Sequence, residues 1–121
     1  MWNYLKRLFK VGHATPDHVP RLFALEFDGE VIAKIAVDDI DFPWTYGHLF
    51  ESAKFERFRT YFTDVDSWPE DDPELEQVCS EVHAKGHFRL RCLETSAVFT
   101  DVVLHHEGNL VWFRYRPEDN T

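Results

Sequence analysis

The sequence is poor in glycine and in sulfur-containing residues, with 5 Gly, 2 Cys and 1 Met among 121 residues, and it has no long apolar run. Its longest uninterrupted apolar stretches have four residues, whereas a membrane-spanning helix needs about 20. The N-terminal segment is basic, but neither an apolar stretch nor a small-residue cleavage site follows it, as a secretory signal requires. We therefore expect neither a membrane span nor a signal peptide, and we expect a cytoplasmic protein.

Several catalytic motifs are also missing. The glycines are isolated from one another, so no glycine-rich loop can cradle a phosphate, and there is no Gly-x-Ser-x-Gly or Cys-x-x-Cys motif. Cys79 and Cys92 are the only cysteines, and in a reducing compartment both are expected to be buried thiols, the alternative being a structural disulfide between them. The sequence thus gives no sign of nucleotide-dependent or cysteine-based redox chemistry and predicts no cofactor. Whether the protein is an enzyme stays open.

Basic residues are scarce relative to acidic ones. Thirteen Lys and Arg stand against 22 Asp and Glu, for a formal net charge of -9. Because phosphates bind Lys- and Arg-rich surfaces, this balance argues against nucleic acid as the main partner. Aromatic residues, by contrast, make up 16% of the chain, which is enough apolar area to fill one core without disulfides or metal. We expect a single domain over residues 1–121.

The chain begins with a predicted amphipathic helix over residues 1–11. Basic residues alternate there with apolar residues at helical spacing, namely Trp2, Leu5, Leu8 and Phe9. Such a helix could lie on an anionic membrane surface, but that surface would repel the acidic remainder of the chain. We therefore expect it to pack on the sheet or on another subunit. Residues 12–20 are predicted to form a linker and residues 117–121 a polar tail.

Alternating apolar residues predict two groups of strands. Residues 21–28 and 31–37 alternate on either side of the tight-turn pair Asp28-Gly29 and predict a β-hairpin. Residues 41–50 contain Pro43, which lacks a backbone N–H, and predict an edge strand or an ordered loop. Alternation resumes towards the C-terminus and predicts a three-stranded meander over residues 87–93, 98–105 and 110–116.

Two helices are predicted between these groups of strands. The first follows Ser52 as its N-cap and extends from Ala53 to about Phe62, and the second follows Asp72 and ends at about Lys85. This order of elements predicts an α+β fold. In that fold an antiparallel sheet, made of the hairpin and the meander, carries the helical pair on one face, and the short N-terminal helix is added to it.

An acidic segment in front of the second helix is the first candidate site. Seven carboxylates fall within 13 residues there, and the presence of two prolines without a glycine excludes an EF-hand calcium loop. The carboxylates either favour the helix macrodipole and are otherwise solvated, or they form a docking surface for a basic protein partner with an aromatic anchor. The candidate partner-binding residues are Asp64, Asp66, Trp68, Glu70, Asp71 and Asp72.

The aromatic segment after the hairpin is the second candidate site. Trp44, Tyr46 and His48 could line a small apolar pocket with polar groups at its edge. The alternative, which ordinary aromatic usage favours, is that Phe42 and Trp44 fill the core.

Histidines form the third candidate site. His83 and His87 are four residues apart, and together with His105 and a nearby carboxylate, Glu81 or Glu107, they could ligate zinc with one open position. However, Gly86 is predicted to end the helix between the first two, and the adjacent residues His105 and His106 face opposite sides of a strand. The alternative is that all of these are surface histidines.

Two segments carry a resemblance to known proteins. Leu25–Glu30 and Asp41–Phe50, the second with an Asp-x-Pro-Trp stretch, resemble parts of a group of small uncharacterised bacterial proteins. Those proteins share a hairpin, this stretch, and a helix that begins near a phenylalanine. The resemblance covers about the middle half of the chain. It implies a bacterial source and a small soluble domain, and it implies no activity or site residue.

The function expected first is that of a non-enzymatic protein-binding module that docks a basic partner through acidic and aromatic surface. The alternative is a small metal-assisted hydrolase that uses the histidines. The oligomeric state stays open, with a homodimer as one candidate.

Overall fold

The computed structural model describes residues 20–117, so the predicted N-terminal helix, almost all of the predicted linker and the tail after Pro117 lie outside the described residues. The elements follow in chain order, with η denoting a 3-10 helix: β1 (Leu22–Phe27), β2 (Glu30–Asp41), β3 (Trp44–Glu51), η1 (Ala53–Phe58), η2 (Val65–Ser67), α2 (Pro73–Lys85), β4 (Arg89–Cys92), β5 (Val98–Glu107) and β6 (Leu110–Pro117).

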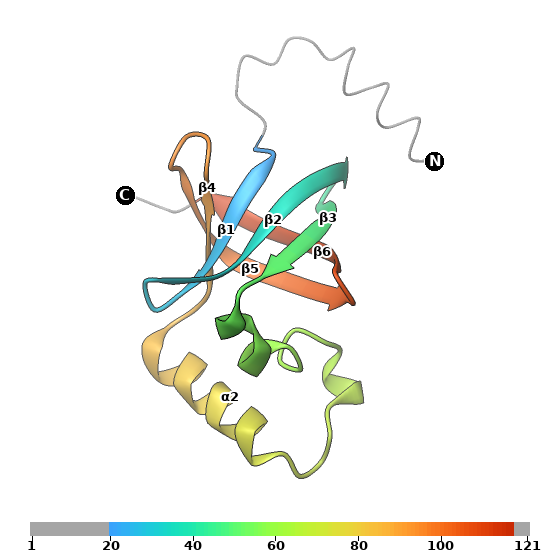
Figure 1. Cartoon of the computed structure of the whole chain (residues 1–121), viewed down its shortest axis with the longest axis vertical. Helices are drawn as coiled ribbons and strands as arrows, with labels where there is room; N and C mark the ends of the chain where they lie inside the picture. The colour runs from blue at the N-terminus through green and yellow to red at the C-terminus, as the bar shows by residue number, and fades with distance from the viewer. Residues whose placement is uncertain (1–19, 118–121) are drawn as a thin grey trace.

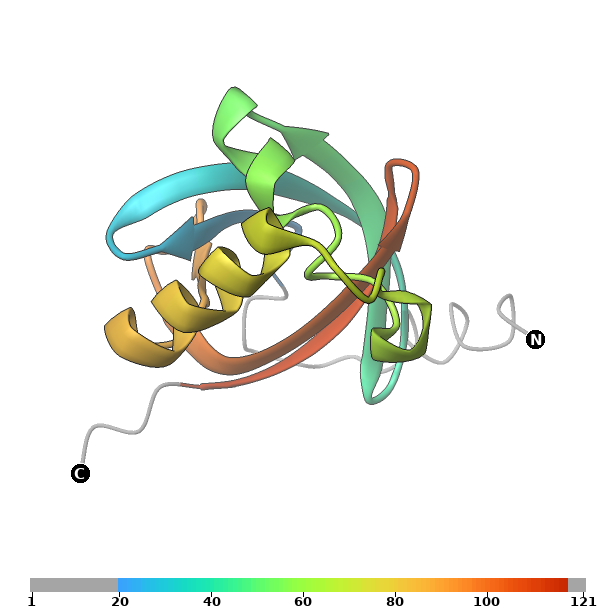
Figure 2. The same cartoon turned by 90° about the horizontal axis from the view of Figure 1, so that it is seen from below.

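The strands form a closed barrel in the order β1-β2-β3-β6-β5-β4 (Figure 1). Two antiparallel meanders, one before and one after the helices, are joined at both edges, because β1 pairs with β4 and β3 pairs with β6. Closure leaves alternate side chains of every strand in a shared interior. Figure 2 shows η1 and α2 lying across one end of this barrel.

Aromatic rings fill much of the interior. Phe23 of β1 and Phe113 of β6 are fully buried, with ring centroids 5.7 Å apart. At the end covered by the helices, Phe55 and Phe58 of η1 are buried as well, and Phe58 lies edge-on to Phe88 with a centroid distance of 5.5 Å. The helical segment therefore closes the barrel with apolar surface.

The predicted sheet with a helical pair on one face is wrong. The hairpin at Asp28-Gly29 is confirmed, since β1 and β2 pair on either side of it, but its strands continue into a closed barrel. The apolar face of the sheet is enclosed inside this barrel, so it does not carry two helices. The helical segment lies across the end of the barrel instead. The pairings that close the barrel join residues far apart in sequence, such as Phe23 with Cys92, and no local pattern indicates them.

Only one of the two predicted helices is a regular α-helix. Asp72 caps α2 by accepting hydrogen bonds from the backbone N–H groups of Glu74 and Leu75, at 3.1 and 3.2 Å, which confirms the predicted start. For the helix predicted from Ala53 to about Phe62, the start is confirmed, since the Ser52 hydroxyl accepts a hydrogen bond from the backbone N–H of Lys54. The predicted end is wrong, because the segment is a 3-10 helix that ends at Phe58. After Arg59 the sequence continues with Thr, Tyr, Phe and Thr at positions 60–63. β-Branched and aromatic residues have low helix propensity, so they do not favour continuation of the helix.

The edge strand or loop predicted for residues 41–50 is wrong as well, because β3 pairs with β2 on one side and with β6 on the other. Pro43 lies in the turn before β3, where its missing N–H costs no ladder hydrogen bond. At Gly47, β3 approaches β2 so closely that an added Cβ would lie 2.3 Å from the backbone carbonyl oxygen of Ala36. This position of β3 therefore requires a glycine.

Both cysteines are free, and Cys92 is buried while Cys79 is half-buried.

Candidate functional site

A stack of planar side chains covers the outer surface of β6. The Cζ atom of Arg114 lies 5.3 Å from the ring centroid of Trp44, and the Trp44 ring lies 6.2 Å from that of His105 on β5. Because β6 separates β3 from β5, the indole of Trp44 must reach across β6. His105 in turn stacks on Trp112, with centroids 6.0 Å apart and an interplanar angle of 25°. We call these four side chains the aromatic ridge.

Strand register places the aromatic ridge on the outside of the barrel. Trp112 is directly opposite Tyr46 of β3 and directly opposite His105 of β5. Its neighbours along β6, Val111 and Phe113, point inward and are buried. Because side chains alternate along a strand, burying these two residues turns Trp112 outward, and its cross-strand partners share that face.

An acidic pocket of about 540 Å³ opens at the Trp112 end of the ridge, and it is lined by Thr63, Asp64, His105, His106, Glu107 and Trp112. Asp64 caps η2 by accepting a hydrogen bond of 3.1 Å from the backbone N–H of Asp66, and it is exposed, as is Glu107. Two carboxylates beside an indole suit a cation, because the carboxylates attract it and the face of the ring binds it as well.

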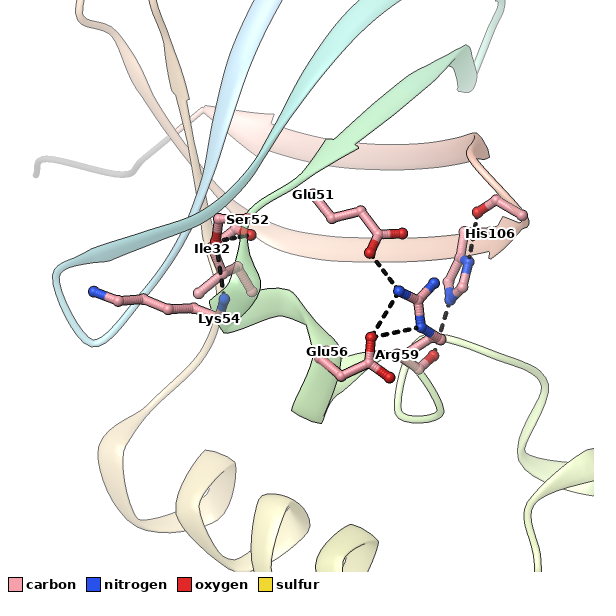
Figure 3. Close-up of polar contacts among 8 residues, drawn as sticks. Ile32, Glu51, Ser52, Lys54, Glu56, Arg59 and His106 are labelled. Carbon is pink, nitrogen blue, oxygen red and sulfur yellow. Dashed lines mark hydrogen bonds and ion pairs between the residues drawn. The ribbon is translucent and has the colours of Figure 1, made fainter.

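His106 fastens the loop that carries Asp64 to the barrel. Its Nε2 lies 2.9 Å from the carbonyl oxygen of Arg59, and its Nδ1 lies 3.2 Å from that of Gly108. Figure 3 shows this contact and the Arg59 guanidinium, which donates hydrogen bonds to Glu51 and Glu56. These two bonds, the one to Glu51 first, raise the pKa of Arg59. The segment after η1 is thereby held against both β3 and the β5–β6 turn.

A basic pocket of about 500 Å³ lies at the Arg114 end of the ridge, lined by Phe42, Pro43, Asp101, Val103, Arg114, Tyr115 and Arg116. Phe42, at the tip of the β2–β3 turn, is 90% exposed. The Nε of Arg116 lies 4.0 Å from the Asp101 carboxylate, and both groups are exposed, so this ion pair is weak. Within residues 20–117, Arg114 contacts Trp44 and makes no ion pair.

The second predicted site, Trp44, Tyr46 and His48, lies together on the outer face of β3. Trp44 is part of the ridge and Tyr46 adjoins it, whereas the Nδ1 of His48 lies 2.6 Å from a carboxylate oxygen of Asp38. The alternative that Phe42 and Trp44 fill the core is wrong, because neither residue is buried.

The predicted acidic segment is divided between several roles. Asp64 lines the acidic pocket and Asp72 caps α2, while Asp66, Glu70 and Asp71 are exposed. Trp68 is half-buried against Tyr61, with ring centroids 5.8 Å apart, and its Nε1 is buried without a hydrogen-bond partner among residues 20–117. Burial also raises the pKa of Tyr61. Since Trp68 packs against Tyr61 and the pocket is lined by Trp112, the aromatic partner of the pocket carboxylates is Trp112, on a strand distant in sequence.

The predicted histidine ligands are spread over different places. His83 is exposed in the last turn of α2, and His87 lines a separate pocket of about 610 Å³ beside Lys85 and Arg89. His105 belongs to the aromatic ridge. Within the described part of the chain, no group of three or more His, Cys, Asp or Glu side chains could hold a metal ion.

Trp112 and Arg114 are not among the sites predicted from the sequence, and Glu107 enters there only as a carboxylate near the histidines. The available signal was the alternation in residues 110–116, where Trp112 and Arg114 share the face opposite the buried Val111 and Phe113. Trp and Arg on one exposed strand face are the residue types enriched at protein interfaces.

Scans against family models, curated proteins and solved structures gave no match. The resemblance to small bacterial proteins and the bacterial source that it implies therefore stay predictions. Among residues 20–117, no helix combines the length and the apolar character that crossing a membrane would need.

Proposed function

We propose that the protein is a non-enzymatic protein-binding module that receives a basic side chain of its partner in the acidic pocket. The observation that carries this proposal is the meeting of Asp64, Glu107 and Trp112 around one hollow. Asp64 comes from the acidic segment before α2, and the other two flank the β5–β6 turn. An ammonium or guanidinium group in this pocket would meet carboxylates at its edge and an indole at its side.

The charge of the whole chain supports a basic partner. A net charge of -9 attracts basic surfaces over distances set by ionic strength and repels acidic ones. The half-buried indoles of Trp44 and Trp112 supply apolar contact area, which electrostatic attraction alone does not. Together they match a partner segment that presents a Lys or Arg next to apolar side chains.

The test is a titration of the 15N-labelled protein with the peptide acetyl-Lys-Leu-Thr-Val-Lys-amide, followed by NMR. We expect shifts at the Trp112 indole N–H and at its neighbours around the acidic pocket. In the double variant Asp64→Asn with Glu107→Gln the affinity should fall about 2- to 30-fold, because each of the two exposed ion pairs contributes about 0.2–1 kcal/mol.

The matched control is the double variant Glu70→Gln with Asp71→Asn, which removes the same charge from exposed positions of the same segment and outside the pocket lining. It should lower the affinity far less than the pocket variant does. Equal losses of affinity in the two variants would show that the peptide binds through the net charge of the protein and not through the acidic pocket. The absence of shifts at Trp112 would overturn the proposal.

A further inference from the structure

The two ends of the aromatic ridge carry opposite charge. The acidic pocket at the Trp112 end has the carboxylates of Asp64 and Glu107, and the basic pocket at the other end has the guanidinium groups of Arg114 and Arg116. Trp112, Arg114 and Arg116 occupy every second position of β6. At about 3.3 Å per residue, Trp112 and Arg116 are about 13 Å apart. A ligand that contacts both pockets must span this distance.

The basic pocket has the charge to receive a carboxylate, because two Arg residues line it against the single carboxylate of Asp101. Arg114 uses the face of its guanidinium against Trp44, and within residues 20–117 it makes no hydrogen bond or ion pair, which leaves its N–H edge for a ligand. A planar guanidinium held on an aromatic ring can donate two parallel hydrogen bonds to one carboxylate. Phe42 and Val103, both exposed, add an apolar wall to the same pocket.

We infer that the ridge binds an extended segment of the partner protein in which a Lys or Arg and an Asp or Glu stand about four positions apart with apolar residues between them. The basic residue enters the acidic pocket, the apolar residues cross Trp44, and the acidic residue meets Arg114 and Arg116. This inference rests on the proposed function, because the basic residue of the segment is the one that the proposed function places in the acidic pocket.

The opposite charges at the two ends give selectivity as well as affinity. A segment with basic residues at both ends places one of them beside Arg114 and Arg116, and a segment with acidic residues at both ends places one beside Asp64 and Glu107. Each like-charge contact weakens binding, so only the segment with one residue of each sign satisfies both pockets.

The experiment compares three peptides with the same apolar centre: acetyl-Lys-Leu-Thr-Val-Glu-amide, and the same peptide with Lys or with Glu at both ends. On the unmodified protein we expect the Lys/Glu peptide to bind about 3- to 10-fold more tightly than the Lys/Lys peptide, and the Glu/Glu peptide to bind most weakly. NMR shifts should include both Trp112 and Arg114.

Reversing one charge should reverse the preference. The Arg116→Glu variant changes an exposed side chain, and on it the Lys/Lys peptide should bind more tightly than the Lys/Glu peptide. The control Lys34→Glu makes the same charge change at an exposed position of β2, and on it the preference should stay as in the unmodified protein.

The outcomes separate this inference from the proposed function. Equal affinity for the Lys/Glu and Lys/Lys peptides, or an unchanged preference in Arg116→Glu, would overturn the inference and leave the acidic pocket as a site for basic side chains. If neither Lys-bearing peptide binds, both the inference and the proposed function are wrong.

Discussion

The helix-covered end of the barrel and the outer face of β6 both gather aromatic rings, but the rings have different neighbours. At the covered end, Phe58 is 2% exposed and packs against Phe27 and Phe88, with centroids 5.1 and 5.5 Å away. On the outer face, Trp44 and Trp112 are half-buried, and their ring neighbours are the guanidinium of Arg114 and the imidazole of His105.

The aromatic residues of these two places therefore fall into two groups, the phenylalanines of the closed interior and the tryptophans of the outer face. Phenylalanine has no polar atom and supplies the closed interior, where every unpaired polar group would cost free energy. Tryptophan, arginine and histidine have a flat apolar surface and a polar edge, so they can pack on one another and still meet water or a ligand. We therefore expect the covered end to determine stability and the ridge to determine binding.

The largest difference in stability is expected between two variants, one that removes an aromatic ring from the covered end and one that removes an aromatic ring from the ridge. Phe58→Ala removes a fully buried ring from the covered end and should lower the free energy of unfolding by about 3–5 kcal/mol. Trp112→Ala removes cross-strand contacts on an outer face and should cost about 1 kcal/mol or less. Urea denaturation of both variants measures the difference.

The binding of the Lys/Glu peptide should show the opposite order. Trp112→Ala should abolish the interaction, whereas Phe58→Ala, measured under conditions in which it remains folded, should retain it. If Trp112→Ala is as destabilising as Phe58→Ala, the ridge is a part of the core and the division between the two places is wrong.

How far the sequence predicts the fold depends on how local each element is. The β1–β2 hairpin follows from alternation around Asp28-Gly29, and the start of α2 follows from Asp72-Pro73, because both signals act within a few residues. The barrel depends instead on pairings such as Gly47 with Val111, whose residues are far apart in the sequence. The same apolar alternation is compatible with an open sheet or a closed one, so it does not decide between them.

The adjacent residues His105 and His106 allow a second comparison between the barrel interior and the aromatic ridge, with a smaller expected effect. His106 points inward and meets two backbone carbonyl oxygens, whereas His105 points outward and stacks on Trp112. His106→Leu removes the ring nitrogens that face these carbonyl oxygens and should lower the free energy of unfolding by about 1–3 kcal/mol. His105→Leu should cost about 0.5 kcal/mol, within the range of cross-strand pairs.

The measurement for this pair is again the urea midpoint, with amide hydrogen exchange to locate the effect. In His106→Leu, exchange should accelerate in η1 and in the β5–β6 turn, the two segments that the ring connects. Equal stability losses in the two variants would contradict the assignment of one histidine to the interior and the other to the ridge.

The candidate site was predictable only in pieces. Trp44 and Asp64 stand out in the sequence, one in an aromatic segment and the other in an acidic one, but nothing local brings them near Trp112. Pairing of β3 with β6 places Trp44 on the ridge, and the contact of His106 with Arg59 holds the loop of Asp64 beside it. Both depend on the closed barrel and therefore appear only with the tertiary structure.

The smallest expected effect concerns the rim of the covered end, where Arg57 of η1 donates two hydrogen bonds, of 3.0 and 2.6 Å, to Glu81 of α2. These bonds hold the pKa of Glu81 below its usual value of 4.5. A lowered pKa in the folded state means that the pair stabilises the fold above the unfolded-state pKa and that this stabilisation is lost as the pH falls through the folded-state pKa.

Glu81→Gln should therefore be less stable than the unmodified protein at pH 7, and the difference between the two should shrink in acid below the usual pKa of 4.5. Urea midpoints measured at neutral and at acidic pH test this. The control Glu76→Gln, at an exposed position in the first turn of α2 without an ion pair among the described residues, removes a charge that interacts only with the helix dipole, so it should change the acid dependence less. A stability difference for Glu81→Gln that stays constant into acid would show that the contact acts through packing, as the contact of Arg57 with the Phe58 ring does, and not through charge.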